Sequence, residues 1–232
     1  VGAGLYDTPY RPRPLLWNYN KNDKYVNERS VGTQQTGWNF VAQIRPWMPT
    51  PLSAVAWFAV DDSSTSPRYP VYGCSTRVSP AYAGVGPQDG HTSPILSFDM
   101  TKAFWVQNMV SNLCYTRWRD MYPIVRSKID ELTLDFITQV ERIDQEALSL
   151  LQRDDGKTSN KKYNNYDKQL DLAIELATNF SYEAGESLHK TWMKFYGDMF
   201  ARFRDYFVVV EDPSNEGCAC RAQELGMTDA WK

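Results

Sequence analysis

The chain has 232 residues, of which 42% are hydrophobic and 23% charged, a composition typical of folded globular proteins and not of disordered ones. Its net charge of −3 provides no basic surface, so we expect no nucleic-acid partner. No apolar run approaches the ~20 residues that a bilayer crossing needs, so we expect no membrane span. The length allows one large or two small domains.

The N-terminal segment predicts an extended arm. It begins Val-Gly-Ala-Gly-Leu-Tyr-Asp, without Met, a basic region or an apolar stretch, so it has the features of neither a signal peptide nor a translation start. We expect Val1 to be a processed end or the start of an excerpt. Residues 1–35 are rich in proline and in turn residues, which favours extended chain and surface loops.

Two β-strands are predicted next. In the run from Trp38 to Arg45, one face carries only apolar side chains and the other carries polar ones; the apolar face consists of Trp38, Phe40, Ala42 and Ile44. Such alternation predicts a half-buried strand. The run from Ala54 to Val60 is apolar at every position and predicts a strand that is covered on both faces, with buried helix as the alternative.

A long irregular segment follows at residues 74–97, rich in Gly, Pro and Ser. Long ordered loops in compact domains are often functional lids or pocket walls. His91 lies in this loop and is a candidate for a direct role, although a lone loop histidine is more often exposed and inert.

From Asp99 to about Tyr206 the pattern predicts helices. The first helix continues to Met121, and Pro123 is expected to end or kink it. The second carries apolar residues at steps of three and four, which make one stripe: Val125, Ile129, Leu132, Phe136, Val140, Ile143, Ala147 and Leu150. Separate third and fourth helices are predicted around Tyr166–Phe180 and Leu188–Phe203. His189 is expected at the core boundary, and Phe207–Val210 is predicted as a last short strand.

Strands therefore come first and helices follow, which predicts the α+β class. We divide the chain into a strand-rich part at residues 1–97, a helical region at residues 98–210 and a surface tail at residues 211–232.

Four cysteines are present: Cys74, Cys114, Cys218 and Cys220. A bond between Cys218 and Cys220 would enclose one residue and be strained, so we expect each to pair elsewhere if it pairs at all. The Cys-Ala-Cys run lacks neighbouring ligands for a metal, so no metal or cofactor is expected. Asn179-Phe180-Ser181 matches the N-glycosylation pattern and makes Asn179 a candidate acceptor.

The residues at the end of the second strand are the main candidates for a binding site. Asp61 and Asp62, with Ser66 close behind, could bind a cation or a substrate amine through oxygen atoms. The competing interpretation is a polar loop that caps the strand, because adjacent side chains on an extended chain point apart.

Arg29 is a second candidate, since a fixed guanidinium can bind a carboxylate or stabilise an oxyanion, although a lone arginine is more often a surface cation. No Gly-x-Ser-x-Gly, phosphate-binding glycine-rich loop or His-Glu-x-x-His occurs in the sequence. The residues alone therefore indicate no complete catalytic set.

An ordered series of short pieces resembles the cysteine dipeptidase family, which includes the secernins and belongs to the N-terminal-nucleophile hydrolases. The pieces are Tyr25–Pro46, Pro49, Val55–Ala59, Tyr69–Gly73, Ser79–Tyr82, Ser97–Asp99 and Ala103–Val106.

This resemblance implies a four-layer αββα sandwich and an N-terminal cysteine whose own α-amino group acts as the base. No cysteine of this chain stands at such a position, so the resemblance implies the C-terminal half of the enzyme, with the nucleophile in an upstream part or chain. An arginine stands in the family where Arg29 stands here, and it implies a supporting role for Arg29. Asp61, Asp62 and Ser66 then become candidates for the rim of the substrate pocket.

The expected function is thus that of a peptide-bond hydrolase acting on small peptides, with the upstream part of the same enzyme as partner and a homo-oligomer as an open possibility for its assembly. The alternatives are a non-catalytic, secernin-like interaction protein, an amidase or acylase acting on a non-peptide amide, and a binding module that uses exposed tryptophans. A lysosomal or secreted location is expected, with the cytoplasm as the alternative.

Overall fold

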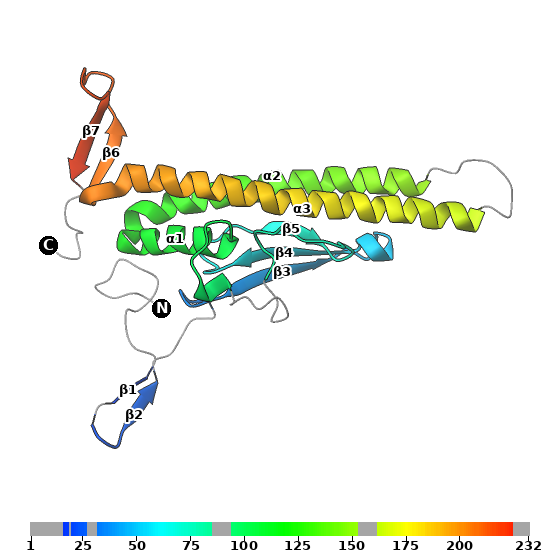
Figure 1. Cartoon of the computed structure of the whole chain (residues 1–232), viewed down its shortest axis with the longest axis horizontal. Coiled ribbons are helices and arrows are strands. Elements are labelled where there is room, and N and C mark those ends of the chain that lie inside the picture. Colours follow the sequence, from blue (N-terminus) through cyan, green and yellow to red (C-terminus); the bar gives the residue numbers. More distant parts are fainter. Residues whose placement is uncertain (1–15, 19, 27–31, 85–93, 153–161, 225–232) are drawn as a thin grey trace.

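The computed structural model describes residues 16–18, 20–26, 32–84, 94–152 and 162–224. Five of the seven strands in the described residues come before the long helices, so the protein is a mixed α/β chain compatible with the α+β class. Figure 1 shows an antiparallel pair of long helices, α2 and α3, with a small sheet and helix α1 along one side. None of the helices in the described ranges combines the length and apolarity that a membrane crossing requires.

The central sheet has three antiparallel strands in the order β3-β4-β5, namely β3 (Trp38–Ile44), β4 (Ala54–Val60) and β5 (Tyr69–Tyr72). Both long strands have the predicted positions, the first ending one residue early. The turn between them is fixed by Arg45, whose backbone N–H donates to Ser53 O at 2.8 Å, and by a short 3₁₀ helix at Thr50–Leu52. Trp38 pairs with Val60 and Ile44 with Ala54, so the two strands are in full register.

One face of this sheet packs on the long helices. Val55 and Tyr72 join residues of α2 and α3 in one hydrophobic cluster, and the Tyr72 hydroxyl donates to Asp144 at 2.7 Å. Arg45 is buried and pairs with the same Asp144. We call this side of the sheet the covered face.

The other side, which we call the open face, differs from expectation. The register places only apolar residues on it: Trp38, Phe40, Ala42 and Ile44 of β3, and Ala54, Ala56, Phe58 and Val60 of β4. The apolar face of β3 was expected to be buried, yet Trp38 is 60% exposed and Phe40 51%. The β4 side chains on this face are half-buried, so β4 is covered on one face and not on both. On β5 the register places Tyr69 and Val71 on this face as well, and Tyr69 is buried against Phe136 of α2 and Leu188 of α3, so the helices reach the open face only at its β5 side.

The helices also differ in their boundaries. Helix α1 (Ala103–Thr116) ends at Arg117, which has φ −151° and ψ 60°, and α2 runs from Trp118 to Gln152 with Pro123 inside it. The expectation that Pro123 would end a helix was therefore wrong, and the break lies at Arg117. Pro123 lies in the early turns of α2 and costs one backbone hydrogen bond, which the packing of the helix tolerates. Six of the eight predicted stripe residues of α2 are buried, the exceptions being Leu132 and Leu150, which are half-buried.

The predicted third and fourth helices are one helix, α3 (Lys162–Phe203). Gly185 lies at the point where we expected a gap, and it stays helical because packing requires its small size. A Cβ there would lie 2.8 Å from Ser79 Cβ and 3.1 Å from a ring carbon of Tyr69. Glycine therefore marks a close helix–loop contact here and not a helix end.

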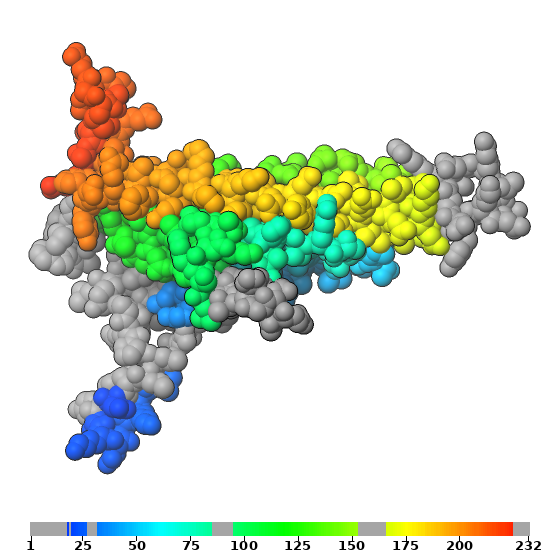
Figure 2. Space-filling view, viewed as in Figure 1, coloured from blue at the N-terminus to red at the C-terminus, as the bar shows by residue number. Residues whose placement is uncertain are grey.

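Two antiparallel hairpins project from the body (Figure 1). The first consists of β1 (Leu16–Asn18) and β2 (Lys24–Val26), and the second of β6 (Phe207–Glu211) and β7 (Cys220–Glu224). The short strand predicted at Phe207–Val210 is confirmed, whereas β7 was not predicted. The space-filling view shows the β6–β7 hairpin projecting from the end of α3 (Figure 2), while Val208 of β6 is buried in a cluster with Trp192 and Phe203 of that helix.

Candidate functional site at the end of strand β4

The chain turns sharply where β4 ends. Asp61 has φ 67°, in the left-handed region that a residue with a Cβ seldom adopts. Its backbone N–H donates to Gly37 O at 2.9 Å, and its carbonyl accepts from Asn39 Nδ2 at 3.1 Å. These bonds tie the end of β4 to the beginning of β3.

A polar stripe on α1 receives the two acids. Asn108 Nδ2 donates to Asp61 Oδ1 at 2.9 Å, and Ser111 Oγ donates to Asp61 Oδ2 at 2.7 Å. The Tyr115 hydroxyl donates to Asp62. Residues 108, 111 and 115 follow steps of three and four and so share one face of the helix. Adjacent acids were expected to point apart, but both carboxylates bind this one stripe.

Burial perturbs Asp61. Its side chain is almost fully enclosed, and burial raises the pKa of its carboxyl above the ordinary value, while the bonds from Asn108 and Ser111 act in the opposite direction and the charge of Asp62 adds to the rise. The Asp61 carboxyl therefore keeps its proton at a higher pH than an exposed aspartate does.

The hydrogen-bond network can serve both protonation states of Asp61. When Asp61 is ionised, Ser111 donates to it and Thr65 Oγ1, 2.6 Å away, can donate to Ser111. When Asp61 is protonated, it can donate to Ser111, whose own proton then turns to Gln107 O at 3.1 Å. The cluster can thus hold or release one proton without leaving a buried polar atom unpaired.

Ser66 closes the turn. It is fully buried, and its backbone N–H donates to Asp62 O at 3.0 Å. Its Oγ has no hydrogen-bond partner among the described residues. An unpaired buried hydroxyl is destabilising by about 1–3 kcal/mol. The structure therefore brings the three predicted residues of this site together, buried beneath the surface.

The thiols of the chain are poor nucleophiles. Burial raises the pKa of Cys74, and burial together with the charge of Asp62 raises that of Cys114 to about 12. Cys218 and Cys220 form a disulfide with each other, so the expectation that each would pair elsewhere was wrong. Thiolate is the reactive form of cysteine, so neither free thiol is activated for attack. Within the described ranges no group of three His, Cys, Asp or Glu residues is placed to hold a metal ion.

The remaining predicted residues fall elsewhere. Arg29 and His91 lie outside the described residues. Gly32, three positions after Arg29, sits against the turn, because a Cβ on it would lie 2.5 Å from Ser63 Oγ. Asn179 is half-buried within α3, and its amide oxygen accepts a bond from Arg77. His189 was expected at the boundary of the core, and it lies just inside the core with 8% of its surface exposed.

Our sequence reasoning missed the α1 side of the site. Asn108, Ser111 and Tyr115 supply the partners of both acids, and their spacing is visible in the sequence. A polar stripe within an otherwise apolar helix indicates a buried polar partner, since unpaired polar groups are rare in protein cores. The signal was present, but nothing in it told us which partner the stripe binds.

A comparison with known protein families places this chain among the peptidases, which hydrolyse peptide bonds. The model of the family described as Peptidase family C69 matches residues 5–131, more than half of the chain. The chain belongs to peptidase family C69, which confirms the resemblance to the cysteine dipeptidases. The match includes the sheet, the acidic turn and α1, and it ends before α3 and the β6–β7 hairpin. A comparison with curated protein sequences finds no match.

Proposed function

We propose that this chain forms part of a dipeptidase-like enzyme of the N-terminal-nucleophile type, in which a cysteine in another part of the enzyme attacks the peptide bond. In this proposal the chain supplies one sheet layer of an αββα sandwich together with its outer helices. The complementary layer carries the cysteine, and the α-amino group of that cysteine acts as the base. The substrate is a small peptide.

The open face is the observation that carries this proposal. All eight of its residues on β3 and β4 are apolar, and Trp38 stacks on Phe40 and Phe58 with ring centroids 5.8 and 6.3 Å apart. An apolar face of this kind is typical of a surface that another layer covers. A second sheet packed about 10 Å away would bury it, as in other sandwiches.

The edge of the sheet supports the same proposal. Strand β3 pairs only with β4 among the described strands, so its other side is an open edge. Natural edge strands are usually protected by charges, proline or bulges, and Trp38–Ile44 contains no charged residue and no proline. An unprotected edge is expected where a further strand or layer completes the structure.

The thiols provide a second line of support. The chain has four cysteines, of which Cys74 and Cys114 have raised pKa values and the other two are bonded to each other. A cysteine nucleophile needs a lowered pKa or an adjacent base. The proposal therefore assigns the reactive thiol to a different part of the enzyme.

The acidic turn takes a positioning role in this proposal. Asp61 and Asp62 fix the end of β4 on α1, where that end forms the wall of the substrate pocket. Ser66 lies in the same turn. Arg29 is assigned a supporting role near the nucleophile, as the resemblance to the family implies.

The test uses an affinity tag at the C-terminus of the chain in cells that produce the whole enzyme. Denaturing mass spectrometry of the purified protein should reveal either a second polypeptide or a longer chain that begins with cysteine. Iodoacetamide should abolish its hydrolysis of dipeptides, whereas Cys74→Ala should leave the rate unchanged. A 26.7 kDa chain that hydrolyses dipeptides alone would contradict the proposal.

A matched pair of substitutions tests the open face directly. Phe40→Lys should prevent association with the complementary layer and abolish hydrolysis, because it places a charge in an apolar interface. Val78→Lys is the control, since Val78 is also exposed but lies outside the sheet. A complete, folded enzyme without activity on dipeptides or other amides would support the interaction-protein alternative.

We also propose a secretory or lysosomal location. The Cys218–Cys220 disulfide supports it, because disulfides persist in oxidising compartments. Glycosidase treatment of the cellular protein tests whether Asn179 carries a glycan. Because Ser181 of the acceptor sequence is buried, the site is accessible to a glycosyltransferase only before the chain folds. A mass that does not change on treatment would contradict the proposal that Asn179 is glycosylated.

A further inference from the structure

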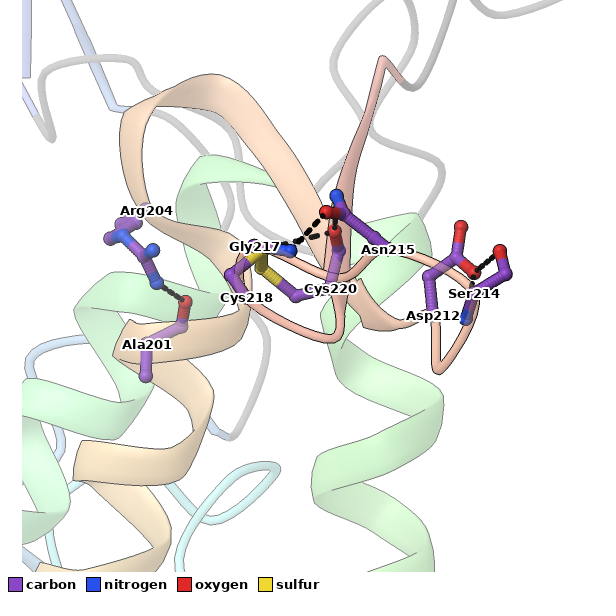
Figure 3. The surroundings of a disulfide bond; sticks show 8 residues. All are labelled: Ala201, Arg204, Asp212, Ser214, Asn215, Gly217, Cys218 and Cys220. Atoms are coloured by element: carbon purple, nitrogen blue, oxygen red, sulfur yellow. Dashed lines mark hydrogen bonds between the residues drawn. A yellow bond between two sulfur atoms is a disulfide. The ribbon is translucent and has the colours of Figure 1, made fainter.

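The loop between β6 and β7 contains an unusual disulfide. Cys218 and Cys220 are bonded across a single residue, with their Cα atoms 5.1 Å apart (Figure 3). Cys218 is exposed and Cys220 half-buried at the first position of β7. This hairpin lies outside the part of the chain that matches the peptidase family, so the family match assigns it no role.

The backbone between the two cysteines is strained. Ala219 has φ 50°, in the left-handed region, and its Cβ makes that conformation unfavourable. Strained or exposed disulfides are more easily reduced than ordinary structural ones. The position of the bond thus favours exchange with thiols from solution.

The loop is held by hydrogen bonds that do not involve the disulfide. Asn215 Nδ2 donates to Cys220 O at 2.7 Å, and Asn215 Oδ1 accepts from Gly217 N at 3.1 Å (Figure 3). Asp212 N donates to Ala219 O at 2.8 Å. The hairpin can therefore remain folded when the sulfur–sulfur bond is broken, as a reversible site requires.

The reduced form has a hydrogen-bond partner ready. Cys218 Sγ lies 3.1 Å from Cys220 O. A disulfide sulfur has no proton to donate, whereas a Cys218 thiol at this position could donate to that carbonyl. Both oxidation states are thus accommodated by the same loop.

A hollow beside Cys220 offers room for a reactant. It has a volume of about 520 Å³ and lies between the end of α3 and the hairpin, with Arg202, Arg204 and Cys220 in its wall. Its acids are Asp198 and Glu211, and Asp198 is paired with Lys194 at 2.6 Å. Arg204 donates to Ala201 O and lies 3.7 Å from Asp205, and its remaining N–H groups together with Arg202 give the hollow a means of binding carboxylate groups.

We propose that Cys218–Cys220 is a thiol–disulfide exchange site that reacts with a small thiol carrying carboxylates, of the glutathione class. The thiolate of the small molecule attacks Cys220 Sγ from the hollow, the sulfur–sulfur bond breaks, and Cys218 leaves as a thiolate that takes a proton from water. A second thiolate attacks the small-molecule sulfur of the mixed disulfide and releases Cys220. The protein disulfide gains two electrons, and two small thiols become one disulfide.

The test is incubation of the folded protein in glutathione buffers of defined ratio, followed by acid quenching, alkylation and mass spectrometry of the peptide that contains both cysteines. We expect reversible reduction in millimolar glutathione without denaturant. Cys218→Ser should trap a mixed disulfide on Cys220. A bond that stays oxidised under these conditions would overturn the proposal, as would pairing of either cysteine with Cys74 or Cys114.

The charge of the reactant provides a second readout. Arg202→Gln combined with Arg204→Gln should slow exchange with glutathione by about tenfold and leave exchange with uncharged 2-mercaptoethanol unchanged, because only the former gains from electrostatic attraction. Arg142→Gln on the distant, exposed surface of α2 is the matched control. Equal slowing with both thiols would overturn the assignment of the arginines. Peptidase activity is not measured, so the outcome is independent of the function proposed above.

Discussion

The two faces of the central sheet differ in what covers them. The covered face rests on α2 and α3, where Tyr72 is 1% exposed and its hydroxyl is bonded to Asp144. The open face carries Trp38, Phe40 and Phe58. Nothing in the described part of the chain buries Trp38 or Phe40. The open face is apolar throughout β3 and β4, as a buried face would be, but the helices of this chain reach it only at β5. The covered face is therefore an interface that is complete within the described chain, whereas Trp38 and Phe40 of the open face remain largely exposed there.

The largest expected effect is on the covered face. Tyr72→Ala should lower the free energy of unfolding by about 3–5 kcal/mol, because it removes a buried aromatic ring and leaves polar groups unpaired. Phe40→Ala on the open face is the matched variant and should change it by less than about 0.5 kcal/mol in the isolated chain. Urea denaturation of both variants gives the comparison. Equal destabilisation would show that the open face is buried within this chain.

The acidic turn at the end of β4 tests how the sheet is anchored to α1. Asp61→Ala should destabilise the chain by about 2–3 kcal/mol, because Asn108 and Ser111 lose their buried acceptor. Asp61→Asn can keep both bonds, and asparagine tolerates the left-handed backbone better than most residues.

The same pair of variants has a defined pH dependence. The folded-state pKa of Asp61 is raised above its unfolded value, so the folded protein binds more protons and ionisation of Asp61 is destabilising. Stability from this group is full below the unfolded pKa of about 3.9 and is lost as the pH rises through the folded pKa. Asp61→Asn should therefore gain stability relative to wild type as the pH rises. A constant difference in denaturation midpoint would contradict a raised pKa.

Two glycines of α3 test how closely this helix packs against Tyr69 of β5 and against Ser79. Gly185→Ala should destabilise the chain by about 1–3 kcal/mol, since its Cβ would meet Ser79 and Tyr69 at less than van der Waals distance. Gly197→Ala is the control, because a Cβ at that position would meet no other part of the chain within 4 Å, and it should stabilise the helix by about 0.5–1 kcal/mol. Thermal unfolding followed by circular dichroism measures both. Stabilisation by both substitutions would mean that the helix does not approach Ser79.

The smallest effect concerns His189 of α3, which lies outside the sheet and both of its faces. Burial lowers its pKa, against the opposing influence of Glu186 and Asp99 and with a small addition from Lys190. The unfolded state therefore binds more protons, and stability should fall as the pH drops through about 6.5, by at most about 1.4 kcal/mol per pH unit. His189→Gln should flatten this slope between pH 7 and pH 5 in denaturant titrations, whereas an unchanged slope would assign it to another group.

Several local features could be read from the sequence because neighbouring residues determine them. The alternation at Trp38–Ile44, the apolar run at Ala54–Val60 and the stripe from Val125 to Ala147 predicted elements that the structure contains. Side-chain periodicity of two or of about 3.6 residues is a property of the backbone itself, so it appears wherever one side of an element is apolar. The family resemblance could be recognised for the same reason, since it rests on short local pieces.

Contacts between distant segments could not be read in this way. Gly185 stays inside a helix because Ser79 and Tyr69 press against it, and Pro123 is tolerated by a helix that packs along its length. The sequence by itself determined which faces are apolar and which residues are acids. Only the tertiary structure decided that Asp61 and Asp62 share one stripe of α1 and that one apolar sheet face is left open. Burial and pairing depend on the geometry of the whole chain, whereas periodicity depends on its neighbours alone.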